Sequence, residues 1–456
     1  MLAIIMAGGR GTRISAIAQD IPKPMIPICG VPVLEREIVC LRNQGFTDII
    51  LTVSHMGEVI MDYFKDGSQL GVHISYYFEK EPLGNAGALF RLRQEIEESG
   101  DDSFLLLNAD AIFDIDFNRM VTFHREKKAE VTLFTHPNAH PYDSGLIIVN
   151  RNEQVDKWLA KEDKRPRWYQ NRVNAGLHVI ANRAIDEYLK LLADDEKMVA
   201  SDAGVHSDKM AIVPIGKVDL DRQILKPLSG TGKMYVYDSP EYVKDMGTPE
   251  RYYSVCKDYE KGIVQAKNLS NKQKAIFLDR DGTINKYVGF LRNIDEFELL
   301  PGVIEAIKKI NASGYLAIVV TNQPVIARGE VSYGELEEIH NKMETLLGEK
   351  GAYIDAIYYC PHHPDKGYDG EIPELKFECD CRKPKPGMLW KAATDFNVDL
   401  SKSWMIGDGE NDVLAGKNAR CKTGYIKREN KLIEADITGE SLLEVCLLYT
   451  SDAADE

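Results

Sequence analysis

The chain has 456 residues, of which 44% are hydrophobic and 28% are charged, and its formal net charge is −15. This composition is typical of a folded protein of two or three domains, and it excludes a disordered chain, a collagen-like rod and a disulfide scaffold. The negative charge argues against non-specific binding to nucleic acid, so anionic substrates would need local basic clusters or metal ions. No apolar run approaches the ~20 residues that span a bilayer. The eight cysteines are expected to be reduced thiols of a cytoplasmic protein.

Short apolar runs alternate with segments of helical periodicity along the whole chain, which predicts an α/β fold with parallel strands. The apolar N-terminus lacks a basic segment and ends in glycines, so it predicts a buried first strand and not a signal peptide. Helical periodicity is clear from Leu336 to Leu347. The expected strands are Leu2–Met6, Asp48–Val53, Ser103–Asn108, Val131–Thr135, Ala275–Asp279, Leu316–Thr321 and Ser403–Gly407.

A polar stretch rich in Lys, Asn and Gln interrupts this pattern at Lys261–Lys274, and an apolar strand follows it at once. We therefore expect two domains, residues 1–262 and 274–445, joined by a linker at 263–273. The residues from 446 to 456 fit neither the strand nor the helix pattern. They predict a disordered tail.

The first expected strand runs into a glycine-rich segment, AGGRGTR at residues 7–13, and Pro22-Lys23-Pro24 follows. Glycines after a parallel strand let backbone N–H groups approach a phosphate chain closely. A glycine-rich turn alone would be weak evidence, but the TR and PKP elements at this spacing indicate a nucleotide site. Its basic residues, Arg13 and Lys23, can neutralise a triphosphate. The expected backbone contacts are Gly8, Gly9 and Gly11.

This combination resembles the sugar-1-phosphate nucleotidyltransferase family over about residues 1–255. The resemblance implies a Rossmann-like fold and several site residues. Gly84, in the segment EPLGNAG, would contact the nucleotide, Asn174 would contact the sugar, and Asp110 and Asp245 would bind Mg²⁺. The family's Glu-Lys sugar element has only an approximate counterpart at Lys161–Lys164, so the sugar contacts and the choice of base are left open.

In that family a sugar 1-phosphate oxygen attacks the α-phosphorus of a nucleoside triphosphate, and pyrophosphate leaves. Because two anions must meet, catalysis depends on positioning and charge neutralisation. We expect Arg13 and Lys23 to supply that charge. Among subfamilies, the segments AGGRGTR, IPKPMIPI and EPLGNAGAL look most like the D-glycero-D-manno-heptose 1-phosphate guanylyltransferases.

The strand at 275–279 delivers two acids in the segment Asp279-Arg280-Asp281-Gly282-Thr283. This pattern resembles the phosphatase motif of the haloacid dehalogenase superfamily and implies a second Rossmann-like domain, without a large cap. Asp279 would be the nucleophile and Asp281 the general acid and base. The other motifs follow in order along the chain, and the phosphate- or substrate-binding residues that they imply are Thr321, Asn322, Arg328, Arg382 and Lys383.

The same resemblance implies a Mg²⁺ site, held by Asp279, by the backbone carbonyl of Asp281 and by Asp408. Asp412 would support the site without binding the metal. The departures from the family pattern are Gln323-Pro324-Val325 and Gly409, which lie at the expected rim of the substrate site. They bear on specificity more than on the chemistry.

Two pairs of metal-binding residue types lie close together before Arg382, namely Cys360-Pro361-His362 and Cys379-Asp380-Cys381. Three thiolates and one imidazole make a closed tetrahedral zinc site, which is structural because no position is left for water. His362 is preferred to His363 because the resembling phosphatases have the spacing C-x-H. The zinc would pin the loop 360–381 beside Arg382 and Lys383.

This zinc pattern occurs in two related phosphatase families, which act on heptose bisphosphate and on histidinol phosphate. The resemblances together imply a bifunctional enzyme that dephosphorylates D-glycero-D-manno-heptose 1,7-bisphosphate and transfers GMP from GTP to the 1-phosphate. The product would be GDP-heptose for surface polysaccharide or glycoprotein. Three alternatives stay open: another sugar or nucleotide, a histidinol-phosphate-type phosphatase, or one inactive half that regulates the other. The expected partners are small molecules, without nucleic acid or membrane, and a homo-oligomer is possible.

Overall fold

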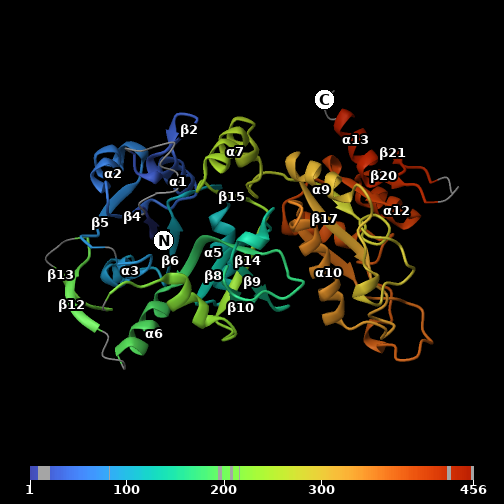
Figure 1. Cartoon of the computed structure of the whole chain (residues 1–456), viewed down its shortest axis with the longest axis horizontal. Coiled ribbons are helices and arrows are strands. Elements are labelled where there is room, and N and C mark those ends of the chain that lie inside the picture. Colours follow the sequence, from blue (N-terminus) through green and yellow to red (C-terminus); the bar gives the residue numbers. More distant parts are fainter. Residues whose placement is uncertain are drawn as a thin grey trace. The chain divides into compact units, whose positions relative to one another are not determined.

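The computed structural model describes residues 1–8, 21–81, 83–193, 198–205, 209–214, 216–428 and 433–452. Its internal contacts divide the chain into two units, each of which is described by itself (Figure 1). The first unit comprises Met1–Thr135, Ile147–Trp158 and Asn174–Asn268. The second unit comprises His136–Leu146, Leu159–Val173 and Leu269–Glu456.

Within the described residues, the first unit is built on a nine-stranded mixed sheet in the order β10-β9-β11-β6-β1-β4-β5, to which β8 and β14 are added beside β11. The four strands β6, β1, β4 and β5 are parallel, and β11 runs antiparallel to β6. The bounds of the main strands are Ala3–Met6 (β1), Asp48–Val53 (β4), His73–Phe78 (β5), Ser103–Asn108 (β6), Val131–His136 (β8), Leu146–Val149 (β9), Val155–Leu159 (β10), Val173–Ala181 (β11) and Met234–Asp238 (β14).

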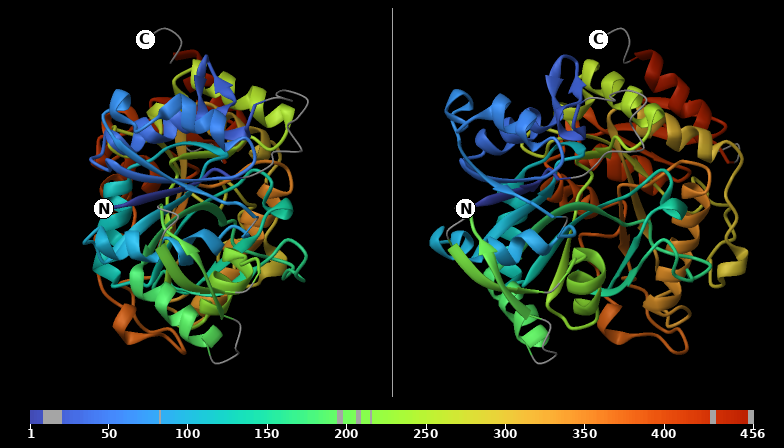
Figure 2. Two further views of the ribbon diagram at one scale, coloured as in Figure 1. Left: turned by 90° about the vertical axis from the view of Figure 1, so that its left-hand side faces the viewer. Right: turned by 60° about the vertical axis from the view of Figure 1, so that its left-hand side comes forward.

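Helices cover both faces of this sheet (Figure 2). Alternate residues of each buried strand point to opposite faces, so Ile5 packs with α1, α2 and α5, whereas Ile4 packs with α3, α4 and α6. This explains why the parallel strands are apolar throughout. The helices are α1 (Val33–Arg42), α2 (Gly57–Phe64), α3 (Gly87–Arg91), α4 (Arg93–Glu98), α5 (Phe117–Lys127), α6 (Asn182–Ala193), α7 (Pro249–Glu260) and α8 (Ile263–Ala266).

Three pairs of short strands complete the first unit: β2 (Pro27–Ile28) with β3 (Val31–Pro32), β7 (Ala111–Asp114) with β15 (Tyr242–Asp245), and β12 (Met198–Ala203) with β13 (Lys209–Pro214). The β7–β15 pair matters for the site because it brings Asp245 opposite Ala111, the residue after Asp110.

Among the described residues, the second unit contains a six-stranded parallel sheet in the order β18-β17-β16-β19-β20-β21. One face packs on α9, α10 and α13, and the other on α11 and α12. The bounds are β16 (Lys274–Leu278), β17 (Tyr315–Asn322), β18 (Ala356–Cys360), β19 (Trp404–Gly407), β20 (Lys422–Ile426), β21 (Ile437–Gly439), α9 (Val303–Ala312), α10 (Tyr333–Gly348), α11 (Gly387–Asp395), α12 (Glu410–Ala419) and α13 (Leu442–Asp452).

Each sheet reverses its strand order beside its first strand. Chain order runs from β1 to β4 and β5 on one side and returns to β6 on the other, and likewise from β16 to β17 and β18 and back to β19. In open α/β sheets such a switch point leaves a crevice at the carboxyl ends of the strands, where ligands bind. The glycine-rich segment that begins at Ala7 follows β1, and the acidic segment that begins at Asp279 follows β16.

The two-domain α/β architecture is confirmed, and the seven expected strands correspond to β1, β4, β6, β8, β16, β17 and β19. The expected linker contains the short helix α8, and the last passage of the chain from the first unit to the second falls between Asn268 and Leu269. The expected disordered tail needs correction as far as Asp452, because those residues continue α13. Cys446 is buried there among apolar side chains, which gives the helix its anchor. Residues 453–456 lie outside the described part of the chain.

In the part of the chain that the structure describes, none of the helices has the length and apolar character needed to cross a membrane.

Two candidate active sites and a candidate metal centre

A cavity of about 1140 Å³ opens at the carboxyl ends of the parallel strands in the first unit. Residues that directly follow β1, β4, β5 and β6 form much of its wall, as the switch-point rule requires. The structure therefore brings together four residues selected from the sequence. They are Gly8, Lys23, Gly84 and Asp110.

Lys23 and Asp110 form the central ion pair of this cavity, with 2.7 Å between Nζ and Oδ2. Lys23 begins a short 3₁₀ turn, Lys23–Met25, whose direction is set by the prolines on either side of the lysine. Its side chain is 11% exposed, whereas that of Asp110 is 49% exposed. The ammonium is thus held at the cavity wall, and the carboxylate keeps a free face toward the cavity.

A buried acid, Glu37 on α1, lies close enough to Asp110 for the two charges to interact. Burial, followed by repulsion from Asp110, raises the pKa of Glu37 well above its ordinary value. Neither carboxyl oxygen has a hydrogen-bond partner. These surroundings therefore favour the protonated, neutral form of Glu37.

The loop at Gly84 is clamped against a second loop by two backbone hydrogen bonds, Ala86 N–H to Val218 O at 3.1 Å and Val218 N–H to Leu83 O at 2.8 Å. Gly84 has φ +83°, and a Cβ at this position would lie 2.2 Å from the carbonyl oxygen of Val218. Only glycine permits this approach. The clamp also sets Lys217 in the cavity wall, a cation that the sequence motifs did not reveal.

The other residues expected in this site have different surroundings. Asp245 is bound by Arg251 at 2.7 Å and by the N–H of Gly247 at 2.8 Å. Burial disfavours its charge, but these bonds lower the pKa of Asp245 overall. Asn174 accepts a hydrogen bond from Gly176 within its own strand. Neither is among the described residues that line the cavity, and Gly9, Gly11 and Arg13 lie outside the described residues.

The second unit has a cavity of about 460 Å³ at the carboxyl ends of β16, β17 and β19. Seven residues selected from the sequence line it: Asp279, Asp281, Thr321, Asn322, Arg382, Lys383 and Asp408. The first two follow β16, the next two end β17, and Asp408 follows β19. The order of strands in the sheet therefore assembles motifs that lie far apart in the sequence.

Lys383 is the buried cation of this cavity, and its Nζ lies 2.8 Å from Asp279 and 2.6 Å from Asp412. Burial disfavours its charge, but the two carboxylates more than offset that effect and raise the pKa of Lys383. Burial raises the pKa of Asp279 to about 7, although the Lys383 ammonium opposes the shift. Lys383 thus orients the carboxylate of Asp279 and partly compensates its charge.

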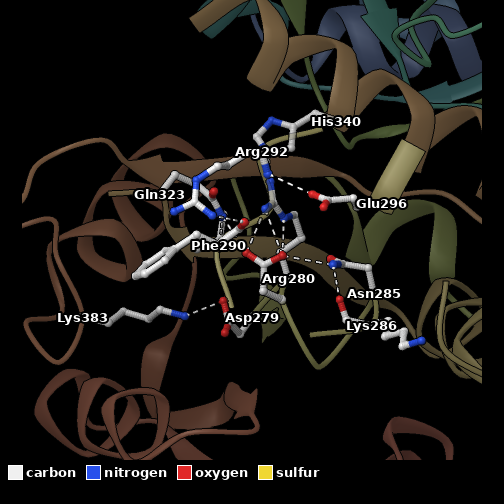
Figure 3. Close-up of polar contacts among 12 residues, drawn as sticks. Asp279, Arg280, Asn285, Lys286, Phe290, Arg292, Glu296, Gln323, His340 and Lys383 are labelled. Atoms are coloured by element: carbon white, nitrogen blue, oxygen red, sulfur yellow. Dashed lines mark hydrogen bonds and ion pairs between the residues drawn. The ribbon is translucent and has the colours of Figure 1, made fainter. Parts of the chain in front are cut away.

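Asp281 is held by three side chains, those of Arg280, Asn285 and Gln323, which Figure 3 labels. Its carboxylate accepts hydrogen bonds from Arg280 at 2.8 and 2.9 Å, from Asn285 at 3.0 Å and from Gln323 at 2.8 Å. Burial disfavours the charged form, but these donors keep the pKa of Asp281 below its ordinary value. The second acid therefore differs from Asp279, since two carboxylates two residues apart have environments that shift them in opposite directions.

Asn322 exchanges two hydrogen bonds with the backbone of Lys383, each 3.0 Å long, and so fixes the residue that carries the cation. Arg382 donates to the carbonyl of His362 at 3.3 Å. Arg328 is not among the described residues that line the cavity; its guanidinium stacks on Phe290 at 4.1 Å and on Tyr368 at 4.4 Å. Of these two rings, Phe290 lines the cavity, so Arg328 supports the wall from behind.

Three acids of the second cavity could hold a metal ion, because one carboxylate oxygen from each of Asp279, Asp408 and Asp412 lies within 4.8 Å of the others. An all-oxygen set at a phosphate site suits Mg²⁺. Burial raises the pKa of Asp408 to about 6, although the nearby Arg428 guanidinium, 2.7 Å away, opposes the shift. The sequence led us to expect Asp412 to support the metal site without binding the ion. In the structure its carboxylate lies close enough to those of Asp279 and Asp408 to share a metal ion with them.

Four residues selected as zinc ligands form a compact cluster: Cys360, His362, Cys379 and Cys381. The three sulfurs lie 3.2, 3.3 and 3.5 Å apart, and His362 Nδ1 lies 3.2 Å from Cys381 Sγ. Ligands of a tetrahedral zinc site with Zn–S bonds of about 2.3 Å are about 3.8 Å apart, so the cluster can close around a metal with small movements. Hydrogen bonding from Cys360, followed by that from Cys379 and His362, lowers the pKa of Cys381 to about 5.

The sequence motifs did not reveal Lys217 and Arg428, which line the cavities. They also did not reveal His340, whose Nε2 lies 3.2 Å from Nη1 of Arg280. Lys217 and Arg428 follow no recognisable motif, and only the fold brings them to the cavities. The sequence did offer a signal for Arg280, because a charged residue between two acids directly after a buried strand is expected near a site.

Comparison with protein-family models gave two matches, to the nucleotidyl transferase family over residues 2–262 and to the haloacid dehalogenase-like hydrolase family over residues 178–420. The chain belongs to both families. It is a nucleotidyltransferase and a phosphatase in one polypeptide, and each unit has a cavity that is lined in part by residues selected from the sequence.

The chain is similar to curated proteins named D-glycero-beta-D-manno-heptose-1,7-bisphosphate 7-phosphatase. The protein of this name from Pasteurella multocida is 45% identical over 165 residues, which are 36% of this chain and 86% of the relative. The protein of Escherichia coli is 42% identical over 165 residues, or 84% of its length. Among solved structures, HddC from Yersinia pseudotuberculosis is 22% identical with a TM-score of 0.44, covering 57% of this chain and 99% of that chain.

Proposed function

We propose that the phosphatase unit removes the 7-phosphate from D-glycero-D-manno-heptose 1,7-bisphosphate, and that the nucleotidyltransferase unit then transfers GMP from GTP to the heptose 1-phosphate. The products are inorganic phosphate, pyrophosphate and GDP-heptose. Such an activated heptose would serve the assembly of surface polysaccharide or glycoprotein, and we expect the enzyme in the cytoplasm, where thiols stay reduced.

The observation that carries this proposal is the fusion itself. Relatives of the phosphatase half are named for a heptose bisphosphate, and removal of a 7-phosphate from that compound leaves a sugar 1-phosphate. A sugar 1-phosphate is the acceptor that a sugar nucleotidyltransferase needs, and this chain has a nucleotidyltransferase domain. The covalent linkage keeps the two activities in fixed proportion. The phosphatase would then supply the substrate of the nucleotidyltransferase.

In the phosphatase unit, a carboxylate oxygen of Asp279 attacks phosphorus, and the bond from phosphorus to the sugar oxygen breaks. Asp281, whose donors favour its charged form, would first take up a proton and then give it to the departing sugar oxygen. Water then attacks the phosphorus of the aspartyl-phosphate, its proton goes to Asp281, and inorganic phosphate leaves Asp279. Lys383 orients Asp279 and binds a phosphate oxygen, together with Thr321. Mg²⁺ held by Asp279, Asp408 and the carbonyl of Asp281 would shield the repulsion between carboxylate and phosphate.

In the nucleotidyltransferase unit, Gly8 and Gly84 of the cavity wall would contact the nucleotide, and the sequence resemblance adds Gly9 and Gly11 as expected contacts of the triphosphate. The same resemblance assigns a sugar contact to Asn174, although Asn174 is not among the described residues that line the cavity. Lys23 and Arg13 stabilise the charge that develops as the sugar phosphate oxygen attacks and pyrophosphate leaves. Lys217 adds a third cation, which would bind the sugar 1-phosphate. A Mg²⁺ ion on Asp110 and Asp245 would neutralise phosphate oxygens during that transfer.

The cluster of Cys360, His362, Cys379 and Cys381 holds zinc in this proposal. Four protein ligands leave no open position, so the metal is structural. It ties the loop 360–381 to Arg382 and Lys383, which follow directly in the chain. Loss of the metal would therefore displace the cation that orients Asp279.

The test is a coupled assay in which purified protein receives heptose 1,7-bisphosphate with each nucleoside triphosphate in turn, while phosphate and pyrophosphate are measured separately. The expected result is phosphate release with every nucleotide and pyrophosphate release with GTP only. Hexose 1-phosphates and histidinol phosphate serve as competing substrates. Faster turnover of a hexose phosphate or of histidinol phosphate would overturn the heptose assignment.

A further inference from the structure

Arg280 of the phosphatase unit is fully buried although it carries a permanent charge. It lies between Asp279 and Asp281, directly after β16. Burial of a guanidinium is costly in free energy unless its N–H groups are paired with acceptors. Its contacts therefore show what this position is built for.

The guanidinium is bound at both ends (Figure 3). On one side Nε and Nη2 donate to the carboxylate of Asp281, at 3.2 Å and at 2.8 and 2.9 Å. On the other side Nη1 donates to Nε2 of His340 at 3.2 Å. A planar group held at two opposite edges has a single orientation.

His340 is suited to this task because it is neutral. It lies on α10, where it is buried, and burial together with the charge of Arg280 lowers the pKa of His340 to about 3. A guanidinium can only donate, so Nε2 must be the unprotonated nitrogen of the ring. The imidazole thus acts as a fixed acceptor on a helix, and the strand-end arginine is braced against that helix.

We propose that Arg280 and His340 are positioning residues that hold the carboxyl group of Asp281 where it serves both phosphatase steps. The same carboxyl must reach the leaving oxygen in the first step and the attacking water in the second. In each step the oxygen that leaves or attacks lies opposite Asp279 on phosphorus, so one position of the carboxyl group serves both steps and a small displacement harms both proton transfers. A misplacement of about 1 Å can cost about 100-fold in rate.

A substrate with a good leaving group distinguishes a positioning role of Arg280 and His340 from a merely structural one. An aryl phosphate such as p-nitrophenyl phosphate expels a stable phenolate and needs no acid, whereas breakdown of the aspartyl-phosphate still needs a base. A misplaced Asp281 therefore spares phosphoenzyme formation and slows its hydrolysis. A loosened fold would slow both steps together.

The experiment compares His340→Leu with His340→Gln, in the full-length protein with p-nitrophenyl phosphate. Glutamine keeps an amide oxygen that can accept from Arg280, whereas leucine removes the acceptor at similar volume. For His340→Leu we expect a burst of about one p-nitrophenol per active site, a steady rate about 100-fold below wild type, and phosphate on Asp279 by mass spectrometry. For His340→Gln we expect a steady rate within about fivefold of wild type.

Three results would overturn the proposal. They are a steady rate of His340→Leu equal to wild type, a parallel loss of burst and steady rates, or a glutamine variant as slow as the leucine variant. Melting temperature and bound zinc are measured alongside, and Arg280→Lys is the second variant if His340→Leu unfolds. Lysine keeps the charge but cannot bridge both partners, so the same burst is expected. Because the probe is an aryl phosphate, the outcome does not depend on heptose as the natural substrate.

Discussion

Gly84 and Gly45 share a left-handed backbone, with φ values of +83° and +88°, yet their surroundings differ completely. A methyl group on Gly84 meets the carbonyl of Val218, whereas at Gly45 nothing lies within 4 Å. Both alanine substitutions share the conformational strain of about 1–2 kcal/mol. Gly84→Ala must in addition separate the two loops of the nucleotide cavity, so we expect a loss of about 100-fold in nucleotidyltransferase kcat/KM.

Steady-state kinetics with GTP and a sugar 1-phosphate measure this effect. Gly45→Ala is the matched control and should keep the activity while losing a similar part of its stability. The phosphatase rate of Gly84→Ala should equal that of wild type. Equal transferase activity in the two variants would show that the loop clamp does not shape the nucleotide site.

His178 on β11 makes the first unit sensitive to acid. The imidazole is fully buried with both ring nitrogens unpartnered, and burial lowers its pKa from 6.5 to about 4. Between these two values the unfolded chain binds a proton that the folded chain cannot, so stability is complete above pH 6.5 and is lost as the pH falls toward 4. Between pH 7 and pH 5 the loss from this one residue is about 2 kcal/mol.

Urea unfolding of His178→Leu should therefore show a difference between pH 7 and pH 5 that is smaller than the wild-type difference by about 2 kcal/mol. Leucine fills a similar volume and leaves no unsatisfied polar atom. His73→Leu, at a side chain that is 72% exposed, is measured beside it, and the reduction of the pH difference should be larger in His178→Leu. An unchanged pH difference in His178→Leu would mean that the imidazole takes up its proton without unfolding.

At this scale the sequence predicted residues that carry their own motif, and it missed residues that depend on a neighbour. Lys23 and Asp110 are recognisable because each stands in a patterned segment, and the sheet brings them to 2.7 Å. His340 has only the periodicity of a buried helix face, and nothing in the chain couples it to Arg280 before the fold is known. Lys217 lines the nucleotide cavity because the backbone hydrogen bonds of Val218 hold its loop against Leu83 and Ala86.

Among the elements, the buried parallel strands were predictable and the mixed part of the first sheet was not. Asp48–Val53 and Ser103–Asn108 match β4 and β6 at both ends, because strands covered on two faces are apolar throughout. By contrast, β11 includes Asn174, Gly176 and His178, so its pattern resembles a binding motif more than a strand. The pairing of β7 with β15 joins segments about 130 residues apart, and no local signal records it.

The zinc loop is the element whose removal should separate the two functions. Cys379→Ser should lower bound zinc from about one per chain to near zero and cut phosphatase activity at least tenfold, because the loop 360–381 leads directly into Lys383. Metal content by mass spectrometry and both enzyme rates are measured on the same preparation. Transferase activity should stay at the wild-type level.

The control for this variant is Cys421→Ala, which removes a buried thiol outside the cluster. It should keep its zinc and its phosphatase rate. If Cys379→Ser lost its zinc and kept full phosphatase activity, the metal would have no part in holding the active-site loop.

In the molecule as a whole, an acidic chain handles anionic substrates through a few placed cations. The net charge of −15 would repel phosphates, but Lys23 and Lys383 stand at the switch points of two separate sheets, each within 2.8 Å of an acid. The acids orient both lysines, and the two carboxylates beside Lys383 also raise its pKa. Both units use the same rule, since the carboxyl ends of parallel strands supply the acids and the following loops supply the cations.

Because each unit has its own cations and acids, the two activities should be separable by single substitutions. Asp279→Asn removes the nucleophile and should lower phosphate release by at least 1000-fold, with pyrophosphate release from GTP and heptose 1-phosphate unchanged. Lys23→Ala removes the cation paired with Asp110 and should lower pyrophosphate release about 100- to 1000-fold, with phosphate release unchanged. Each variant is assayed for both products, and a mixture of the two variants should convert heptose bisphosphate to GDP-heptose. Loss of both activities in either variant would mean that one unit regulates the other.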